Sequence, residues 1–154
     1  MAEGINIHAS CVAIGGKGVL ILGKSGQGKS DLALRLMDDG ARLVADDRTL
    51  LAVIGGKLFA QPPTSIAGLI EVRGLGIVAR PFAQKALVAL AVQLGKEDER
   101  LPRPSFYIPP SPLKLAKPPP LIRLDGAMPS APARIRLALA AFTNGLMRED
   151  FNPT

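Results

Sequence analysis

The stretch Gly23-Lys24-Ser25-Gly26-Gln27-Gly28-Lys29-Ser30 matches the pattern G-x-x-x-x-G-K-[ST] at every fixed position. Glycines at this spacing let backbone N–H groups turn inward around phosphate oxygens, and the helix that follows presents the positive end of its dipole. The lysine of such a loop reaches the β- and γ-phosphates of a nucleotide, and the serine hydroxyl ligates Mg²⁺. The stretch therefore predicts a phosphate-binding loop (P-loop) for a nucleotide with Mg²⁺, with Lys29 on the phosphates and Ser30 on the metal.

The sequence on both sides of this loop has the context that the motif requires. The apolar run Gly18–Leu22 precedes the loop and is typical of a β-strand. The segment Lys29–Asp39 follows it, with leucines on one face of an amphipathic helix, and Gly40 is the residue type expected just after a helix end. A strand, a Gly-rich loop and a helix in this order make a chance match improbable.

The rest of the chain alternates short β-capable runs with turn signals and ends in a second helix. Further strands are predicted over residues 5–14, 42–45, 50–54, 57–60, 69–72 and 85–93. Residues 102–120 hold eight of the fourteen prolines, which exclude a regular helix or a central strand there. A closing helix is predicted at about 133–144, between Pro132 and Gly145. We expect one α/β domain spanning residues 1–154, with a mixed sheet, flanking helices and a Pro-rich loop.

Composition narrows the class of protein. Hydrophobic residues make up 47% of the 154 residues, and no apolar run is long enough to span a membrane. The net charge is +6, of which residues 1–99 contribute +1 and residues 100–154 contribute +5. This excess favours an anionic partner, but with five Phe, one Tyr and no Trp the stacking side chains for nucleic acid are scarce. One cysteine and the absence of a signal peptide fit the cytoplasm.

Two adjacent acids, Asp46 and Asp47, end the apolar run Leu43-Val44-Ala45. In a P-loop fold, an acid at the end of a neighbouring strand lies near the phosphates, where it holds Mg²⁺ or accepts a proton.

Two other familiar nucleotide-binding motifs are not matched by this sequence. No asparagine is followed by lysine, as guanine recognition in Ras-like GTPases requires, and Gly74-x-Gly76-x-x-Ala79 is followed by Arg80-Pro81 where a dinucleotide fingerprint needs a helix.

Four features occur together in the order and spacing of a known family. They are His8, the P-loop, Val44-Ala45-Asp46-Asp47 and Glu71-Val72-Arg73-Gly74-Leu75-Gly76. Over about residues 5–80 the chain resembles the catalytic domain of the HPr kinase/phosphorylase family. Only seven residues precede His8, so we expect a short form without the N-terminal domain of full-length members. The resemblance implies an ATP-dependent serine kinase that phosphorylates the phosphocarrier protein HPr and also removes the phosphate by phosphorolysis.

The resemblance also assigns roles to particular residues. It implies that Asp46 is the base that accepts the serine proton, and by microscopic reversibility the acid in dephosphorylation. It implies Ser30 and Glu71 as Mg²⁺ ligands, Lys29 as the group that neutralises the transferred phosphoryl group, and His8 as an upstream active-site residue. Arg100, in Asp98-Glu99-Arg100-Leu101-Pro102, is the nearest match to the family's catalytic arginine segment. Family members assemble as homo-oligomers, typically hexamers, so the resemblance implies an oligomer.

One family segment has no clear counterpart in this chain. The arginine-containing segment Pro-x-Arg-Pro-Gly-Arg-Asn, tied to dephosphorylation, is matched only in fragments around Arg123 and Arg134. Two alternatives therefore stay open beside the HPr kinase. One is a P-loop kinase of a small molecule, and the other is a regulatory module that binds ATP without transferring phosphate.

Overall fold

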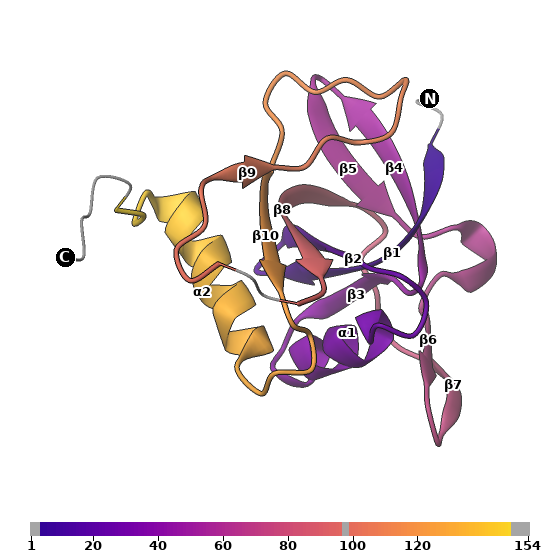
Figure 1. Cartoon of the computed structure of the whole chain (residues 1–154). Helices are drawn as coiled ribbons and strands as arrows, with labels where there is room; N and C mark the ends of the chain where they lie inside the picture. Colours follow the sequence, from indigo (N-terminus) through magenta and orange to yellow (C-terminus); the bar gives the residue numbers. More distant parts are fainter. Residues whose placement is uncertain (1–3, 97–98, 149–154) are drawn as a thin grey trace.

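The computed structural model describes residues 4–96 and 99–148. An eight-stranded mixed sheet forms its centre, and two helices pack on one face of that sheet (Figure 1). The sheet strands are β1 (Ile5–Ile14), β2 (Lys17–Leu22), β3 (Arg42–Ala45), β4 (Arg48–Ile54), β5 (Lys57–Gln61), β8 (Ala86–Leu94), β9 (Ser105–Phe106) and β10 (Pro120–Leu124). The helices are α1 (Lys29–Asp38) and α2 (Ala131–Asn144), with a short 3-10 turn η1 at Thr64–Ile66.

The direction of the central strands decides where the functional groups meet. β1 pairs antiparallel with both β2 and β3, and β8 pairs parallel with both β2 and β10. Consequently β3, β2, β8 and β10 all point the same way, and the loops after their last residues meet at one edge of the sheet. Ligands of open α/β sheets bind outside such carboxyl ends. The P-loop follows β2, and Asp46 follows β3.

Side chains that alternate along β1, β2 and β8 supply two separate cores. On one face, Val19 and Ile21 pack with Leu32 and Leu36 of α1 and with residues of α2. On the other face, Leu20 packs with residues of the β4–β5 hairpin, which folds across the sheet because β5 pairs with the start of β8. Cys11 lies within this second core, and burial raises the pKa of its thiol to about 12.

The Pro-rich segment covers the second core. Its side chains Tyr107, Leu113 and Leu115 pack against that core, and the backbone N–H of Ala116 donates to the carbonyl of Gly56 at the β4–β5 turn, 3.1 Å away. In Figure 1 the segment loops over the ends of β4 and β5 before it returns as β10. It is therefore an extended cover for the core, held by backbone hydrogen bonds and apolar contacts.

A separate two-stranded hairpin leaves the body of the molecule beside α1. It consists of β6 (Leu69–Val72) and β7 (Gly76–Ala79), and Figure 1 shows it projecting away from the main sheet. Leu75 and Ile77 at its tip are 74% and 71% exposed. The hairpin's base is held to the sheet edge by hydrogen bonds, and its inner strand carries Glu71.

The predicted elements are confirmed with small differences at their ends, and three strands were not predicted. β7, β9 and β10 were missed because the first follows a glycine-rich turn and the other two flank or contain prolines, which single-sequence patterns exclude. β9 is the edge strand, and Pro120 is the first residue of β10, a position where a proline costs few ladder hydrogen bonds. Within the described residues, neither helix has the length and apolar character needed to cross a lipid bilayer.

Candidate active site

The P-loop between β2 and α1 adopts a shape that depends on its glycines. Gly26 and Gly28 have φ angles of 86° and 88°, a left-handed conformation that residues with a Cβ rarely adopt. A Cβ on Gly23 would come within 2.9 Å of the side chain of Gln27, whose amide oxygen accepts a hydrogen bond from the Lys24 N–H at 2.7 Å. The loop is thus closed on itself, with its backbone turned around the space in front of α1.

Two side chains at the start of α1 face this space. The Lys29 ammonium donates to the carbonyl of Gly23 at 2.9 Å, so it folds back over the loop, and the residue is only 5% exposed. The Ser30 hydroxyl donates to Asp46 Oδ1 at 2.5 Å. Both lie in the first turn of α1, where the helix dipole favours an anion. The local structure therefore offers an anion site with one cation and one hydroxyl.

Asp46 is buried, and its carboxylate is surrounded by donors. Oδ1 accepts hydrogen bonds from the hydroxyls of Ser10 and Ser30, and Oδ2 accepts one from the backbone N–H of Glu71 at 3.0 Å. The residue is 8% exposed. These three bonds tie together β1, α1 and the β6–β7 hairpin, so the carboxylate of Asp46 holds three elements in register around the P-loop.

Asp47, unlike the buried Asp46, has an exposed side chain that lies beside a cation. Its side chain is 57% exposed, and its Oδ1 lies 3.8 Å from the Lys29 ammonium. Its φ is 66°, and it is the only non-glycine among the described residues with a left-handed backbone. The backbone N–H of Asp47 donates to the buried Ser10 hydroxyl at 3.0 Å, which stabilises this conformation. A carboxylate held in an uncommon backbone conformation beside a cation is typical of a functional site.

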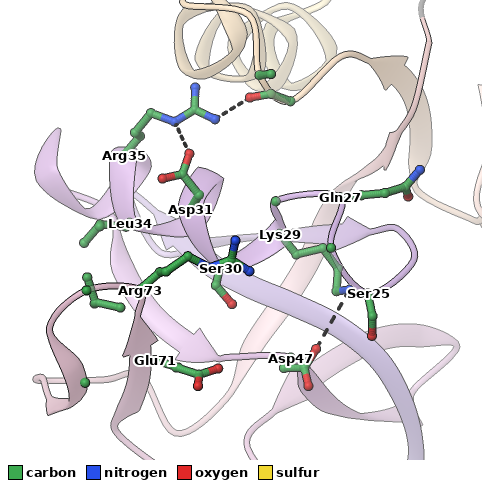
Figure 2. A pocket seen from close by; sticks show the side chains of 17 residues that line it. Ser25, Gln27, Lys29, Ser30, Asp31, Leu34, Arg35, Asp47, Glu71 and Arg73 are labelled. Atoms are coloured by element: carbon green, nitrogen blue, oxygen red, sulfur yellow. Dashed lines mark hydrogen bonds and ion pairs between the residues drawn. The ribbon is translucent and has the colours of Figure 1, made fainter.

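A cavity of about 910 Å³ opens in front of these residues. Its walls come from the P-loop, the first turns of α1, Asp47, the β6–β7 hairpin and the loop after β10. Figure 2 shows Asp47 and Glu71 on one side of Ser30, and Asp31 and Arg35 on the other. The cavity has room for a nucleotide, and oxygen ligands gather on the side of Asp47.

The β6–β7 hairpin contributes one side chain of each charge. The side chains of Glu71 and Arg73 both line the cavity, and both residues are exposed to it. Figure 2 shows Arg73 reaching toward Ser30. The hairpin therefore supplies a carboxylate and a guanidinium to the cavity.

The residues present fit a magnesium ion. Ser30, Asp46, Asp47 and Glu71 supply only hard oxygen donors, the type that Mg²⁺ prefers. In the described residues no three His, Cys, Asp or Glu side chains form a metal site by themselves, and Mg²⁺ in nucleotide sites relies on phosphate oxygens and water for its other ligands. A phosphate group bound beside these three carboxylates would be repelled by them, and a divalent cation would offset that repulsion.

Other predicted residues lie outside the cavity wall. His8 is exposed on β1 opposite Arg48, on the same face of the strand as Ser10 and therefore near the Asp46–Asp47 corner. Arg100 is exposed and is not among the residues that line the cavity, and its catalytic role stays a prediction. Arg123 on β10 and Arg134 on α2 are also absent from the wall.

Sequence reasoning missed several residues that the fold brings to the site. Ser10 lies inside an apolar strand and gave no signal, although its hydroxyl links Asp46 and Asp47. Gly126 and Ala127, after β10, line the cavity, as does Arg35 of α1. Of the arginines at the site, only Arg73 lies in a stretch that the sequence analysis singled out, Glu71-Val72-Arg73-Gly74-Leu75-Gly76. The other residues become neighbours of the P-loop through strand pairing that local sequence does not reveal.

The model of the family described as "HPr Serine kinase C-terminal domain" matches residues 1–99. The chain belongs to this family. A solved structure, that of the Hpr(Ser) kinase/phosphatase from Coxiella burnetii, is similar to this one. The match covers 92% of this chain and 96% of that chain, with a TM-score of 0.72 and 26% sequence identity.

Curated relatives carry the name HPr kinase/phosphorylase. The protein of Mycoplasmopsis pulmonis is 43% identical over 77 residues, which cover 50% of this chain and 25% of that protein. The protein of Clostridium acetobutylicum is 41% identical over 101 residues, 66% of this chain and 32% of that one. The chain thus matches a quarter to a third of the length of these relatives. Residues 1–99, which the family model matches, contain the P-loop, the two aspartates and the β6–β7 hairpin.

Proposed function

We propose that this protein is an ATP-dependent serine kinase that phosphorylates HPr or an HPr-like phosphocarrier, and that the same site catalyses the reverse phosphorolysis. The observation that carries the proposal is the convergence of Lys29, Ser30, Asp47 and Glu71 on one cavity at the carboxyl edge of the sheet. Phosphoryl transfer needs positioning and charge neutralisation, and these groups supply both. The names of the relatives supply HPr as the phosphoacceptor, and the description of the family supplies serine as the residue phosphorylated.

In the kinase direction the serine hydroxyl of the acceptor attacks the γ-phosphorus of ATP, its proton passes to a carboxylate, and ADP leaves. The contacts favour Asp47 over Asp46 as that base. Both oxygens of Asp46 already accept hydrogen bonds, whereas Asp47 lines the open cavity beside Lys29. In the reverse direction, the protonated carboxyl returns its proton to the serine oxygen as phosphate attacks.

The remaining groups offset the charge of the phosphates. Lys29 neutralises the transferred phosphoryl group, and Arg73 is our choice for the second cation in place of Arg100, because Arg73 lines the cavity. Mg²⁺ would supply neutralisation of the charge that develops on the phosphate. Ser30 and Glu71 are proposed to hold it, with Asp46 keeping the Ser30 hydroxyl in place.

We also propose that the protein assembles into a homo-oligomer. Light scattering of the purified protein measures its molar mass and tests this assembly.

The direct test incubates the purified protein with γ-labelled ATP, Mg²⁺ and HPr and looks for label that is stable as a phosphoserine. Label on HPr that returns as pyrophosphate when unlabelled phosphate is added supports both directions. ATP binding without any transfer supports the regulatory module, and label on a metabolite but not on HPr supports a small-molecule kinase. Either result would contradict the proposal.

A further inference from the structure

The cavity has a second end, beyond the P-loop, that none of the residues assigned above occupies. Gly126 and Ala127, in the loop between β10 and α2, form its wall. Neither has a polar side chain, and Gly126 packs so closely that a Cβ there would lie 3.1 Å from the side chain of Leu94. The loop therefore contributes a small, apolar surface to an end of the cavity that Asp31 and Arg35 of α1 also line.

Strand order sets this loop on the opposite side of the P-loop from Asp47. Asp47 follows β3, which reaches β2 through β1, whereas the loop follows β10, which reaches β2 through β8. Neighbouring strands lie roughly 4.8 Å apart, so each group is displaced roughly 10 Å from the P-loop strand, in opposite directions. The P-loop thus lies between a carboxylate side and an apolar side.

Arg35 holds the loop in its place. Its Nε donates to Asp31 Oδ2 at 3.1 Å, and its two terminal nitrogens donate to the backbone carbonyls of Gly126 and Met128. All three nitrogens are therefore engaged by the protein, and the charge is partly offset by Asp31. The loop is also closed internally, because the N–H of Ala127 donates to Asp125 Oδ1 at 2.9 Å. Arg35 lines the cavity as a positioning residue, not as a free phosphate ligand.

We propose that residues 125–128 form the nucleoside subsite of this enzyme, with Arg35 as the residue that positions the loop. The inference rests on the proposed phosphoryl transfer. In that reaction the attacking oxygen and the leaving oxygen lie in line on opposite sides of the phosphorus. With the proton acceptor Asp47 on one side of the P-loop, the leaving ADP extends to the other side, where Gly126 and Ala127 leave room for its nucleoside.

The loop therefore favours a nucleoside triphosphate over pyrophosphate as phosphoryl donor. Pyrophosphate occupies only the P-loop and the metal, whereas a nucleotide gains additional contact with Ala127 and its neighbours. Because the loop presents no polar side chain to this end, the gain comes from shape and apolar contact. Filling this end should consequently weaken nucleotide binding without affecting pyrophosphate.

The test compares Ala127→Leu with Ala133→Leu. Ala127 is exposed to the cavity, and Ala133 is exposed on α2 outside the cavity wall, so the same change is made in both variants and neither disturbs the core. Isothermal titration calorimetry measures the affinity of each for the Mg²⁺ complex of the non-hydrolysable ATP analogue AMPPNP, and for Mg²⁺-pyrophosphate. We expect Ala127→Leu to lose roughly tenfold or more in AMPPNP affinity. Its pyrophosphate affinity and both affinities of Ala133→Leu should stay within about twofold of the parent chain.

Each other outcome overturns a defined part of the reasoning. Unchanged AMPPNP affinity in Ala127→Leu, or an equal loss for AMPPNP and pyrophosphate, contradicts the nucleoside subsite. A parent chain that binds pyrophosphate but not AMPPNP also contradicts it, although the P-loop then still binds phosphate. A parent chain that binds neither ligand contradicts the proposed function itself.

Discussion

Replacing Asp46 and Asp47 by asparagine, one at a time, should separate stability from catalysis. The two residues are adjacent in sequence but differ in burial and in hydrogen bonding. Asp46 accepts three hydrogen bonds in a buried position, while the Asp47 side chain is largely exposed and lies beside the ammonium of Lys29.

The magnitude for Asp46→Asn follows from its three hydrogen bonds. A bond to a charged acceptor contributes about 1.5–3 kcal/mol and a neutral one about 0.5–1.5 kcal/mol, so the two serine bonds that the remaining amide oxygen can accept weaken by about 1 kcal/mol each. The bond from the Glu71 N–H is lost, because an amide nitrogen cannot accept it. We expect the free energy of unfolding to fall by about 4 kcal/mol, and transfer to fall with it because the Ser30 hydroxyl is held less firmly. The carboxylate of Asp46 is therefore expected to have mainly a structural role.

Asp47→Asn should change the free energy of unfolding by less than about 0.5 kcal/mol, because its exposed ion pair contributes little and asparagine tolerates the left-handed backbone. Loss of a general base lowers kcat by roughly 10²–10⁴-fold. Nucleotide affinity should stay constant or rise, since a negative charge 3.8 Å from the Lys29 ammonium is removed.

The chain has no tryptophan, so urea unfolding is followed by far-ultraviolet circular dichroism, and transfer from ATP to HPr is measured in the same preparations. The expected pattern is a large stability loss for Asp46→Asn only, and a kcat loss at unchanged stability for Asp47→Asn. Full kcat in Asp47→Asn would refute its assignment as base. Unchanged stability in Asp46→Asn would refute the account of its three hydrogen bonds.

Three further predictions concern Lys29, the arginines and Cys11. Lys29→Met should lower the affinity for Mg²⁺-ADP roughly 100-fold in calorimetry. The fold should be kept, because methionine has an unbranched side chain of similar length and only the ammonium is lost. Arg73→Gln should lower kcat by roughly 10²–10³-fold and Arg100→Gln by less than about twofold. A larger loss of kcat in Arg100→Gln than in Arg73→Gln would assign the second cation of the site to Arg100. Burial raises the pKa of the Cys11 thiol from 9.0 to about 12, so the folded state keeps the proton that the unfolded state releases. Its contribution to stability is present below pH 9 and falls by roughly 1.4 kcal/mol per pH unit as the pH rises toward 12, a slope that Cys11→Ala should remove in urea titrations at several pH values.

Local sequence was sufficient for the features that a few consecutive residues control. The P-loop was predictable because its glycines, Lys29 and Ser30 are contiguous, and the left-handed backbone at Gly26 and Gly28 needs no distant partner. Strands β1 to β6 and helix α1 followed from hydrophobic periodicity and turn residues. The α/β class was predictable for the same reason.

The remainder depends on pairing between distant segments. Sequence alone could not distinguish the roles of Asp46 and Asp47, because their difference arises from the register of β3 against β1, which brings the Ser10 hydroxyl between them. It also could not bring Gly126 to the P-loop, since that position depends on β10 pairing with β8 after a proline-rich segment that shows no strand pattern. A residue type can be recognised in isolation, but the side of the phosphate on which it lies is decided by the order of the strands.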